Sequence, residues 1–332
     1  LILSSDSGGG LSVGGDFFVD ASTGTFSANE RTVTLNGGDQ NIGSGSGDKG
    51  VAFYTLDMQS STGVTIANDI SSSVEILQNL KLTSGGTFTT NGNLTLSSRV
   101  DGTSVVNASI TRGSGTLTSS SGETAKRLIN GTADSGNADT GTLGDDADWR
   151  ILGFPFASGG TASGLVKDNG EVLPVDLPSG GGSDSNTGNS MIFKWDALNN
   201  TWDDATPGTG NSSFGQTDGF ILFFFDDSED PIDPSLTFKS TGTFPSYGSD
   251  ATTSINIDDA TSDPNGNGNS GFVLLSNPYP AKYDLSQATT SGFSSISGLS
   301  GTIGAWEGFF VDVSGSGTGT ITFNRAGITS GT

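Results

Sequence analysis

The residues best suited to hold a metal ion lie in the segment DPNGNG, which begins at Asp263. An acidic residue, two amide side chains at alternate positions and a glycine at the sixth position match the start of a calcium-binding loop. The three ligands in this register are Asp263, Asn265 and Asn267. Position twelve, normally acidic, is Leu274, but Asp258 and Asp259 can supply the missing charge. Asn and Gly also favour the positive φ angles of tight turns, so the alternative is a polar hairpin turn.

Catalysis has few candidate residues, because the chain contains no His and no Cys. Ser-His-Asp and Cys-His arrangements, thiolate chemistry and zinc bound by His or Cys are therefore excluded. Paired carboxylates remain, and a glycosidase needs two of them facing each other across a cleft. The candidates are Asp145, Asp146 and Asp148 before Trp149, Asp203 and Asp204 after Trp202, and Asp226 and Asp227. Most of them stand in Gly- and Ser-rich segments typical of solvated turns, so we expect no enzymatic activity.

Trp195, Trp202 and Tyr247 carry large amphipathic rings of the kind that form a platform for sugars. The segment IFKWDALNNTWDD is typical of a hairpin with LNN as its turn, whose aromatic side chains cover a sheet. Because aromatic side chains are more often buried than exposed, we expect these rings to pack in the core. Sugar binding is the alternative.

The elements that position these residues are β-strands. Val, Ile, Leu and Phe recur in short runs such as TVTLNG, LTLSS and FILFFF, bounded by Gly, Asn, Asp and Ser. Apolar residues at helical spacing are nearly absent, and no apolar run approaches the roughly 20 residues of a membrane helix. We therefore expect an all-β protein without a membrane span.

The chain is strongly acidic, with a net charge of −23 from 36 Asp and Glu against 13 Lys and Arg. It has no basic patch to neutralise phosphates, which excludes nucleic acid as a partner. An excess of Asp suits a salty or calcium-containing exterior, where counterions screen the self-repulsion.

Residues 1–124 repeat one pattern, a few alternating apolar residues, then Gly, Asn or Asp, then another short alternating run. This pattern predicts a β-solenoid-like (β-helix) region, in which each turn buries its apolar residues against the next. An ordinary antiparallel sandwich is the alternative, since alternation alone does not separate the two.

Residues 125–332 contain all 10 prolines and all four tryptophans. Three blocks occur twice in the same order: RILGFPF and VLLSNPY, DGFILF and EGFFVD, LTFKSTG and ITFNRAG. We therefore predict a duplicated, jelly-roll-like β-sandwich, with copies at about 149–242 and 272–327. Pro155 and Pro278 align, and proline ends sheet pairing because it lacks an N–H. The segment NPYP is then a structural corner, with Tyr279 packed back over the sheet.

Four short motifs occur in a fixed order. They are Trp149-Arg150 with Pro155, then Gly219-Phe220, then Asn277-Pro278-Tyr279-Pro280, then Gly308-Phe309-Phe310-Val311. This order, after solenoid-like repeats, resembles large secreted proteins of Bacteroidetes-type bacteria exported by the type IX secretion system. The resemblance implies an extracellular, cell-surface or released protein. The family's C-terminal sorting domain is absent from this sequence, which starts without Met, so we expect a mature or excised piece.

These observations favour a non-enzymatic extracellular structural or adhesive surface protein. Self-association by end-to-end strand pairing would build a filament or a surface layer, because open sheet edges accept further strands. The partners expected are further copies of the chain, other surface proteins and glycans. The alternative function is a carbohydrate-binding or accessory module of a larger secreted enzyme or adhesin.

Overall fold

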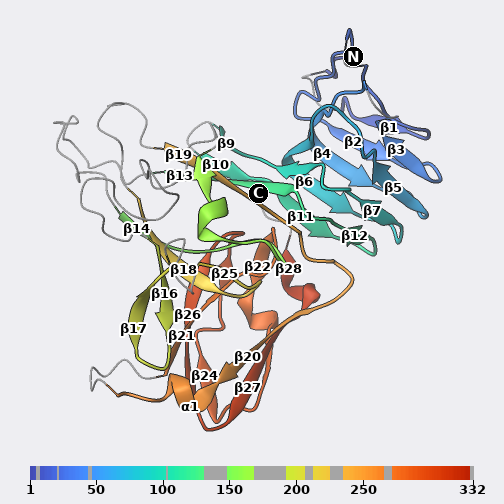
Figure 1. Cartoon of the computed structure of the whole chain (residues 1–332). Coiled ribbons are helices and arrows are strands. Elements are labelled where there is room, and N and C mark those ends of the chain that lie inside the picture. The colour runs from blue at the N-terminus through green and yellow to red at the C-terminus, as the bar shows by residue number, and fades with distance from the viewer. Residues whose placement is uncertain are drawn as a thin grey trace, which may run out of the picture.

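The computed structural model describes the chain over most of its length. The described residues are 1–4, 8–20, 22–43, 47–101, 104–130, 148–167, 192–205, 212–224, 235–264 and 271–329. The fold is all-β, as predicted, with 51% strand and 5% helix. Figure 1 shows a stack of short strands on the N-terminal side and longer antiparallel strands after it. None of the helices in these ranges has the length and apolar character that a membrane crossing requires.

The N-terminal region is a β-solenoid of about three turns, as predicted. Both of its sheets are parallel, which rules out the antiparallel sandwich for this region. The first sheet runs through β1 (Leu11–Val13), β2 (Thr32–Leu35), β4 (Ala52–Met58), β6 (Val74–Leu82) and β8 (Leu94–Leu96). The second runs through β3 (Gln40–Ile42), β5 (Gly63–Ile66), β7 (Thr87–Thr89) and β12 (Thr116–Thr118).

Apolar residues of like position stack from turn to turn inside the solenoid. Leu11, Val33, Leu56, Leu80 and Ile110 lie opposite one another in successive strands. All but the first are fully buried. Burying each such side chain contributes roughly 1.5–3 kcal/mol. Since the contacts join only neighbouring turns, each turn is stabilised by the next one.

A hairpin interrupts the last part of the solenoid. The first half of β6 pairs with β8, and the second half pairs with β11 (Ser109–Arg112). Between these two strands, β9 (Ser98–Asp101) and β10 (Ser104–Asn107) form an antiparallel hairpin. A backbone bond from Ala108 N to Ser97 O, 2.7 Å long, closes its base. The hairpin is thus an insertion between two strands that both pair with β6.

β13 (Glu123–Asn130) joins the two regions. Its start runs parallel to β8, and its whole length pairs antiparallel with β19 (Ser235–Gly242). The first solenoid sheet therefore continues into the second region as one nine-stranded sheet (Figure 1). The predicted boundary between residues 124 and 125 falls inside this strand, and a division there stays a prediction.

The second region consists of two segments with similar strand pairing. In the first, β19 pairs with β13 and with β15 (Val166–Lys167), while β18 (Gly219–Phe224) pairs with β14 (Asp148–Gly153) and β16 (Ile192–Asp196). In the second, β27 (Thr318–Phe323) pairs with β20 (Ala251–Asn256) and β23 (Thr289–Ser291), while β26 (Gly308–Ser314) pairs with β21 (Phe272–Ser276) and β24 (Ser295–Ser297). All eight pairings are antiparallel.

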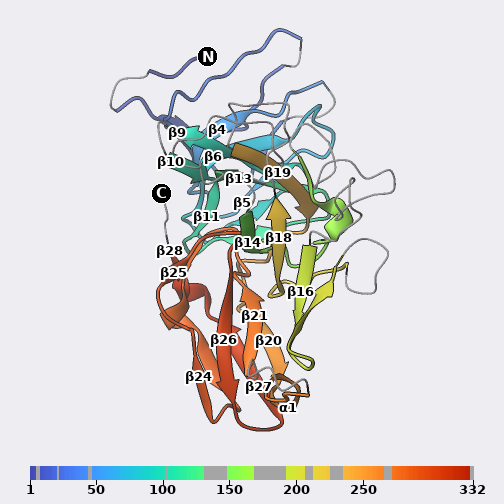
Figure 2. The ribbon, with the colours of Figure 1, turned by 90° about the vertical axis from the view of Figure 1, so that its left-hand side faces the viewer.

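Further elements extend each segment. β16 also pairs with β17 (Thr201–Asp204), and β22 (Lys282–Asp284) pairs with β25 (Thr302–Ile303) and β28 (Ile328–Thr329). In the described residues, the helical elements are one short α-helix, α1 (Ile257–Ala260), and three 3-10 turns, η1 (Ala162–Gly164), η2 (Leu285–Gln287) and η3 (Arg325–Gly327). In Figure 2, β21, β26, β20 and β27 extend below the solenoid, and β16 runs beside β21.

The registers of the two segments also correspond. Gly153 lies opposite Gly219, and Ser276 lies opposite Gly308, as the aligned blocks predict. The segments meet at these strand ends, where Gly153 N donates to Trp306 O (3.0 Å) and Ser276 N donates to Thr217 O (2.9 Å). The correspondence fits the predicted duplication, but a duplicated, jelly-roll-like sandwich remains a proposal.

The NPYP segment forms the predicted corner at the end of β21. The side chain of Asn277, fully buried, accepts a hydrogen bond from Tyr279 N (3.0 Å) and donates to the carbonyls of Ala281 (2.7 Å) and Gly304 (2.9 Å). Tyr279 packs back over the second segment and is also fully buried. Pro280 O accepts a bond from Ile110 N, 3.0 Å long, so the corner also contacts the solenoid.

Candidate functional site

The predicted calcium ligands are only partly placed. Asp263 is exposed, shortly after α1, whereas Asn265 and Asn267 lie outside the described residues. Asp259 accepts a bond from the Asn256 amide (2.7 Å) at the start of α1. No group of three or more Asp and Glu side chains that could hold a metal occurs within the described ranges. The calcium site stays a prediction.

The predicted carboxylate pairs do not form a facing pair where the structure describes them. Asp203 and Asp204 are consecutive on β17, so their side chains point to opposite faces of the sheet. Asp148 starts β14. Asp145, Asp146, Asp226 and Asp227 lie outside the described residues.

Glu123 is a fully buried carboxylate at the end of the solenoid. Gly92 N (3.0 Å) and Leu94 N (2.8 Å) donate to its two oxygens, and the Thr90 hydroxyl also donates to it. Burial raises the pKa of Glu123, and these hydrogen bonds oppose the rise. Because its acceptor sites face backbone and Thr90 donors, this carboxylate ties the start of β13 to the turn before β8.

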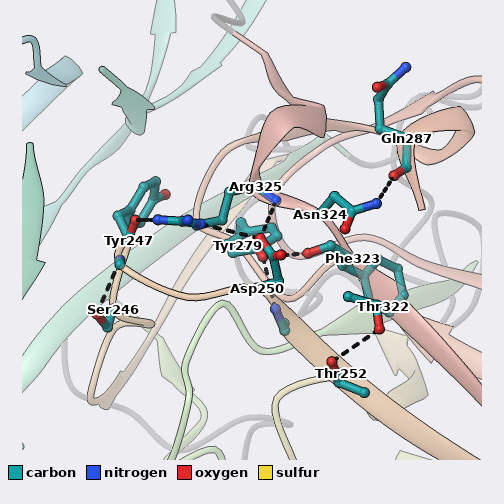
Figure 3. A network of polar contacts seen from close by, with 12 residues as sticks. Ser246, Tyr247, Asp250, Thr252, Tyr279, Gln287, Thr322, Phe323, Asn324 and Arg325 are labelled. Atoms are coloured by element: carbon teal, nitrogen blue, oxygen red, sulfur yellow. Dashed lines mark hydrogen bonds and ion pairs between the residues drawn. The ribbon is translucent and has the colours of Figure 1, made fainter. Parts of the chain in front are cut away.

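A second buried polar group joins the strands of the second segment (Figure 3). The Tyr279 hydroxyl donates to Phe323 O (2.7 Å) and accepts from Ala251 N (3.0 Å). Burial raises the pKa of Tyr279 to about 12, with the Asp250 carboxylate adding to the rise and the Ala251 N–H opposing it. Arg325 forms an ion pair with Asp250 (3.2 Å), with the two side chains 29% and 40% exposed, so this part of the network lies at the surface.

Nearby, Arg325 Nη1 donates to Tyr247 O (2.7 Å), and Arg325 N donates to Asp250 Oδ1 (2.8 Å). Burial also raises the pKa values of Tyr247 and Tyr283. The network of Figure 3 therefore holds strands together, and the Tyr279 hydroxyl at its buried end already both donates and accepts a hydrogen bond.

The hairpin predicted from IFKWDALNNTWDD is present as β16 and β17. Asp196 Oδ1 accepts from Leu198 N (2.9 Å) and Asn199 N (3.2 Å), and Asn200 takes a φ of 52°. These are the features of a tight Asx-type turn. The hairpin sets Trp195 directly opposite Trp202, with ring centroids 5.2 Å apart.

The two tryptophans belong to an exposed aromatic face. The register of the sheet β14–β18–β16–β17 places Trp149, Phe193, Trp195 and Trp202 on one side, while Leu152, Phe220, Leu222 and Ile192 fill the core on the other. Trp149 is 45% exposed and Trp202 37%. The prediction of core packing is therefore wrong for Trp202, and Trp195 is only half-buried, whereas Tyr247 is a core residue as predicted.

Two phenylalanines of the second segment extend this surface. The Phe310 ring lies 5.8 Å from Trp195 and 6.1 Å from Trp202, and Phe272, 37% exposed, contacts it from β21. Trp195 Nε1 donates to Phe272 O (2.7 Å), which fixes the hairpin on β21. We call this surface the aromatic face; it comprises Trp149, Phe193, Trp195, Trp202, Phe272 and Phe310. In Figure 1, β16, β17, β21 and β26 lie side by side.

A polar groove of about 420 Å³ borders the aromatic face at Trp195. It is lined by Asp196 and Asp203 of the hairpin and by Asn256 and Asp259 on the other side. Lys194 and Asp218 also line it and form an ion pair of 2.9 Å. By the sheet register, however, Lys194 and Asp203 lie on the opposite face of the hairpin from Trp195 and Trp202, whereas Asp204 lies on the same face as the rings.

Comparisons with protein-family models, with curated proteins and with solved structures give no match to this chain. The site therefore has to be interpreted from its own geometry. Sequence reasoning missed Trp149, Phe193, Phe272 and Phe310 as parts of it. Trp149 and Phe272 occupy aligned positions just before the two prolines, which is the signal that could have indicated them.

Proposed function

We propose that this chain is a non-enzymatic, extracellular adhesive β-protein whose aromatic face binds carbohydrate. The observation that carries the proposal is the exposure of Trp149, Trp202 and Phe272 on one continuous surface. A soluble protein rarely leaves a cluster of large rings exposed unless the surface binds something. Sugars fit this surface because their C–H faces pack on aromatic rings while their hydroxyls bond nearby polar groups.

The proposed location outside the cell is supported by the resemblance to surface proteins and by the acidic composition. A net charge of −23 is best tolerated where salt or calcium screens it. The shared pairing order of the two segments supports a duplicated sandwich, a scaffold that holds the rings on a rigid sheet and not on a loop.

The test is a binding screen with a panel of soluble polysaccharides, both neutral and acidic, using affinity electrophoresis followed by calorimetry. Trp202→Ala should weaken binding roughly tenfold or more, because the loss of one stacking ring removes at least about 1.4 kcal/mol. Phe18→Ala is the matched control, since Phe18 is 59% exposed on the solenoid, away from the aromatic face. Circular dichroism and thermal melting would show that both variants fold.

Loss of binding with Trp202→Ala alone supports the proposal. Equal affinities for the two variants and the unmodified chain would refute it, and so would a panel without any ligand. A parallel series with a calcium chelator tests whether the loop at Asp263 takes part.

End-to-end assembly is the second candidate function. In the described part of the chain, β1 is an edge strand of the nine-stranded sheet, and Ile2 and Phe18, which precede and follow it in the sequence, are 70% and 59% exposed. An open edge beside apolar side chains can accept a strand of another copy. Electron microscopy should then show fibres that Phe18→Lys shortens or abolishes, whereas single particles at every concentration would exclude this function.

A further inference from the structure

A cleft of about 760 Å³ lies where the solenoid meets the second region. Its solenoid side is formed by β10, β11 and β13, and its other side by β14, β22, β25 and the start of β26. Figures 1 and 2 both show β11, β25 and β28 close together at this junction. The cleft is separate from the groove beside Trp195.

The charge of this cleft is opposite to that of the chain. Arg127, Arg150 and Lys282 line it, and Glu307 is the one acidic residue among its described lining residues. In the whole chain, by contrast, 36 acidic residues outnumber 13 basic ones. The protein as a whole has a charge of −23, but the potential in this cleft is locally positive. The cleft therefore favours an anionic ligand over a neutral or cationic one.

Two buried donors in the cleft have no partner among the described residues. The Nε atom of Arg127 is buried and forms no hydrogen bond, and the side chain is 18% exposed. The hydroxyl of Ser109 is also buried without a partner, and that residue is 5% exposed. Buried polar groups are nearly always hydrogen-bonded, so two unpaired donors on residues that line one cleft point to an acceptor that the described residues do not supply.

Glu307 does not satisfy these donors. Its Oε2 is held by Gly304 N at 2.7 Å, and its Oε1 lies 3.4 Å from Nη2 of Arg127. The guanidinium therefore keeps most of its five donors for another group. A planar carboxylate is the anion that matches a guanidinium edge with two parallel hydrogen bonds, while the Ser109 hydroxyl can donate a third.

Ile151 connects the cleft to the aromatic face. It lines the cleft, is 38% exposed, and lies two residues from Trp149 on the same side of β14. A sugar chain stacked on the aromatic face therefore reaches the cleft along this strand. We propose that the cleft binds the carboxylate of an acidic sugar, so that the ligand is a polysaccharide containing uronic acid. This inference rests on the proposed carbohydrate binding.

The experiment compares oligomers of galacturonate and of glucuronate with their methyl esters, which are neutral but otherwise alike. Calorimetry at about 0.15 M salt keeps the screening length near 8 Å, so the acidic surface elsewhere has little effect. The unmodified chain should bind one acidic oligomer roughly tenfold or more tightly than its ester, as expected for a charged hydrogen bond. Arg127→Gln and Ser109→Ala should each reduce that preference and leave the affinity for the ester unchanged.

Arg31→Gln is the matched control, since it removes one positive charge at the far end of the solenoid, where Arg31 Nε donates to Ser4 O (2.8 Å). Its preference for the acid should equal that of the unmodified chain. The comparison of acid with ester needs no variant, so it decides the question even if Arg127→Gln fails to fold.

The outcomes separate the two proposals. Equal binding of acid and ester, with both weakened by Trp202→Ala, would overturn the carboxylate site and leave the aromatic face as the binding surface. A preference for the acid that Arg31→Gln reduces as much as Arg127→Gln would also overturn it. If the panel and all four oligomers fail to bind, the carbohydrate-binding function is itself wrong, and the carboxylate site with it.

Discussion

Exchanging the residues at the contact of the two segments tests whether they are equivalent. Gly153 ends β14 and Ser276 ends β21, and the aligned blocks place them at the same position. They also touch, because a Cβ atom at Gly153 would lie 1.9 Å from Ser276 Cβ and 2.4 Å from its Oγ. Only one of the two positions can therefore carry a side chain. If the two segments are equivalent, the side chain should be tolerated at either position, provided that the other position is glycine.

Gly153→Ser alone should be strongly destabilising. Carbon atoms in contact need about 3.5–4.0 Å, so a shift of about 2 Å is required. Both strands are held at this point, by the bonds from Gly153 N to Trp306 O (3.0 Å) and from Ser276 N to Thr217 O (2.9 Å). Overpacking of a held core site costs about 3 kcal/mol. Ser276→Gly alone loses a buried hydroxyl that has no partner among the described residues, so its cost is the backbone entropy of about 0.5–1 kcal/mol.

The double variant, Gly153→Ser with Ser276→Gly, should recover most of the stability. Thermal unfolding followed by circular dichroism measures the stability of the unmodified chain, the two single variants and the double variant. With an unfolding entropy of about 2.1 cal/mol/K per residue over 332 residues, a 3 kcal/mol loss lowers Tm by about 4 °C if the chain unfolds as one unit. Gly38→Ser is the control, because a Cβ there meets nothing within 4 Å. A double variant as unstable as Gly153→Ser would show that the two positions are not equivalent.

Three further predictions concern buried polar groups. Tyr279→Phe should lower the free energy of unfolding by about 2 kcal/mol in urea titration, because Ala251 N and Phe323 O lose their bridging hydroxyl; an unchanged midpoint would mean that the strands close and bond directly. The pKa of Tyr279 is about 12 in the folded chain, against an ordinary value of 10, so the free energy of unfolding should fall by about 2–3 kcal/mol between pH 10 and 12. The absorbance of the phenolate should rise together with unfolding. Ionisation of Tyr279 at pH 10 in a chain that is still folded would contradict its burial. Glu123→Gln should cost about 1–3 kcal/mol, because an amide NH₂ replaces an acceptor facing backbone N–H groups. In the unmodified chain, the free energy of unfolding should decrease as the pH rises above 4.5, because the raised pKa of Glu123 means that the folded state disfavours its ionised form. Glu123→Gln should remove this decrease. Equal melting curves of the variant and the unmodified chain would exclude both effects.

The solenoid and the turns could be predicted because their signals are local. Val33 and Leu35 alternate with polar residues, and both are fully buried in β2. The turn after Asp196 follows from a short run of Asn and Asp, and the corner at Tyr279 from the inability of proline to continue a sheet. In each case the physical cause lies within a few residues of its effect.

The exposed face and the junction could not be predicted because they depend on distant pairing. β14 is apolar on both sides, with Trp149 and Ile151 facing one way and Leu152 the other, so alternation does not tell which side is buried. Likewise, the pairing of β13 with both β8 and β19 follows from long-range register. The cleft at Arg127 exists only because that pairing brings the two regions together.

The aromatic face arises where the two similar segments differ. By the aligned blocks, Trp149 corresponds to Phe272, so each segment places a ring at the same outer position. In the first segment β16 turns back as β17, whereas β24, its counterpart in pairing, has no such partner within residues 271–329. This extra strand brings Trp202 against Phe310 of the other segment. The outward rings of the two sheets are thereby joined into a single surface, and the polar groove lies at its border.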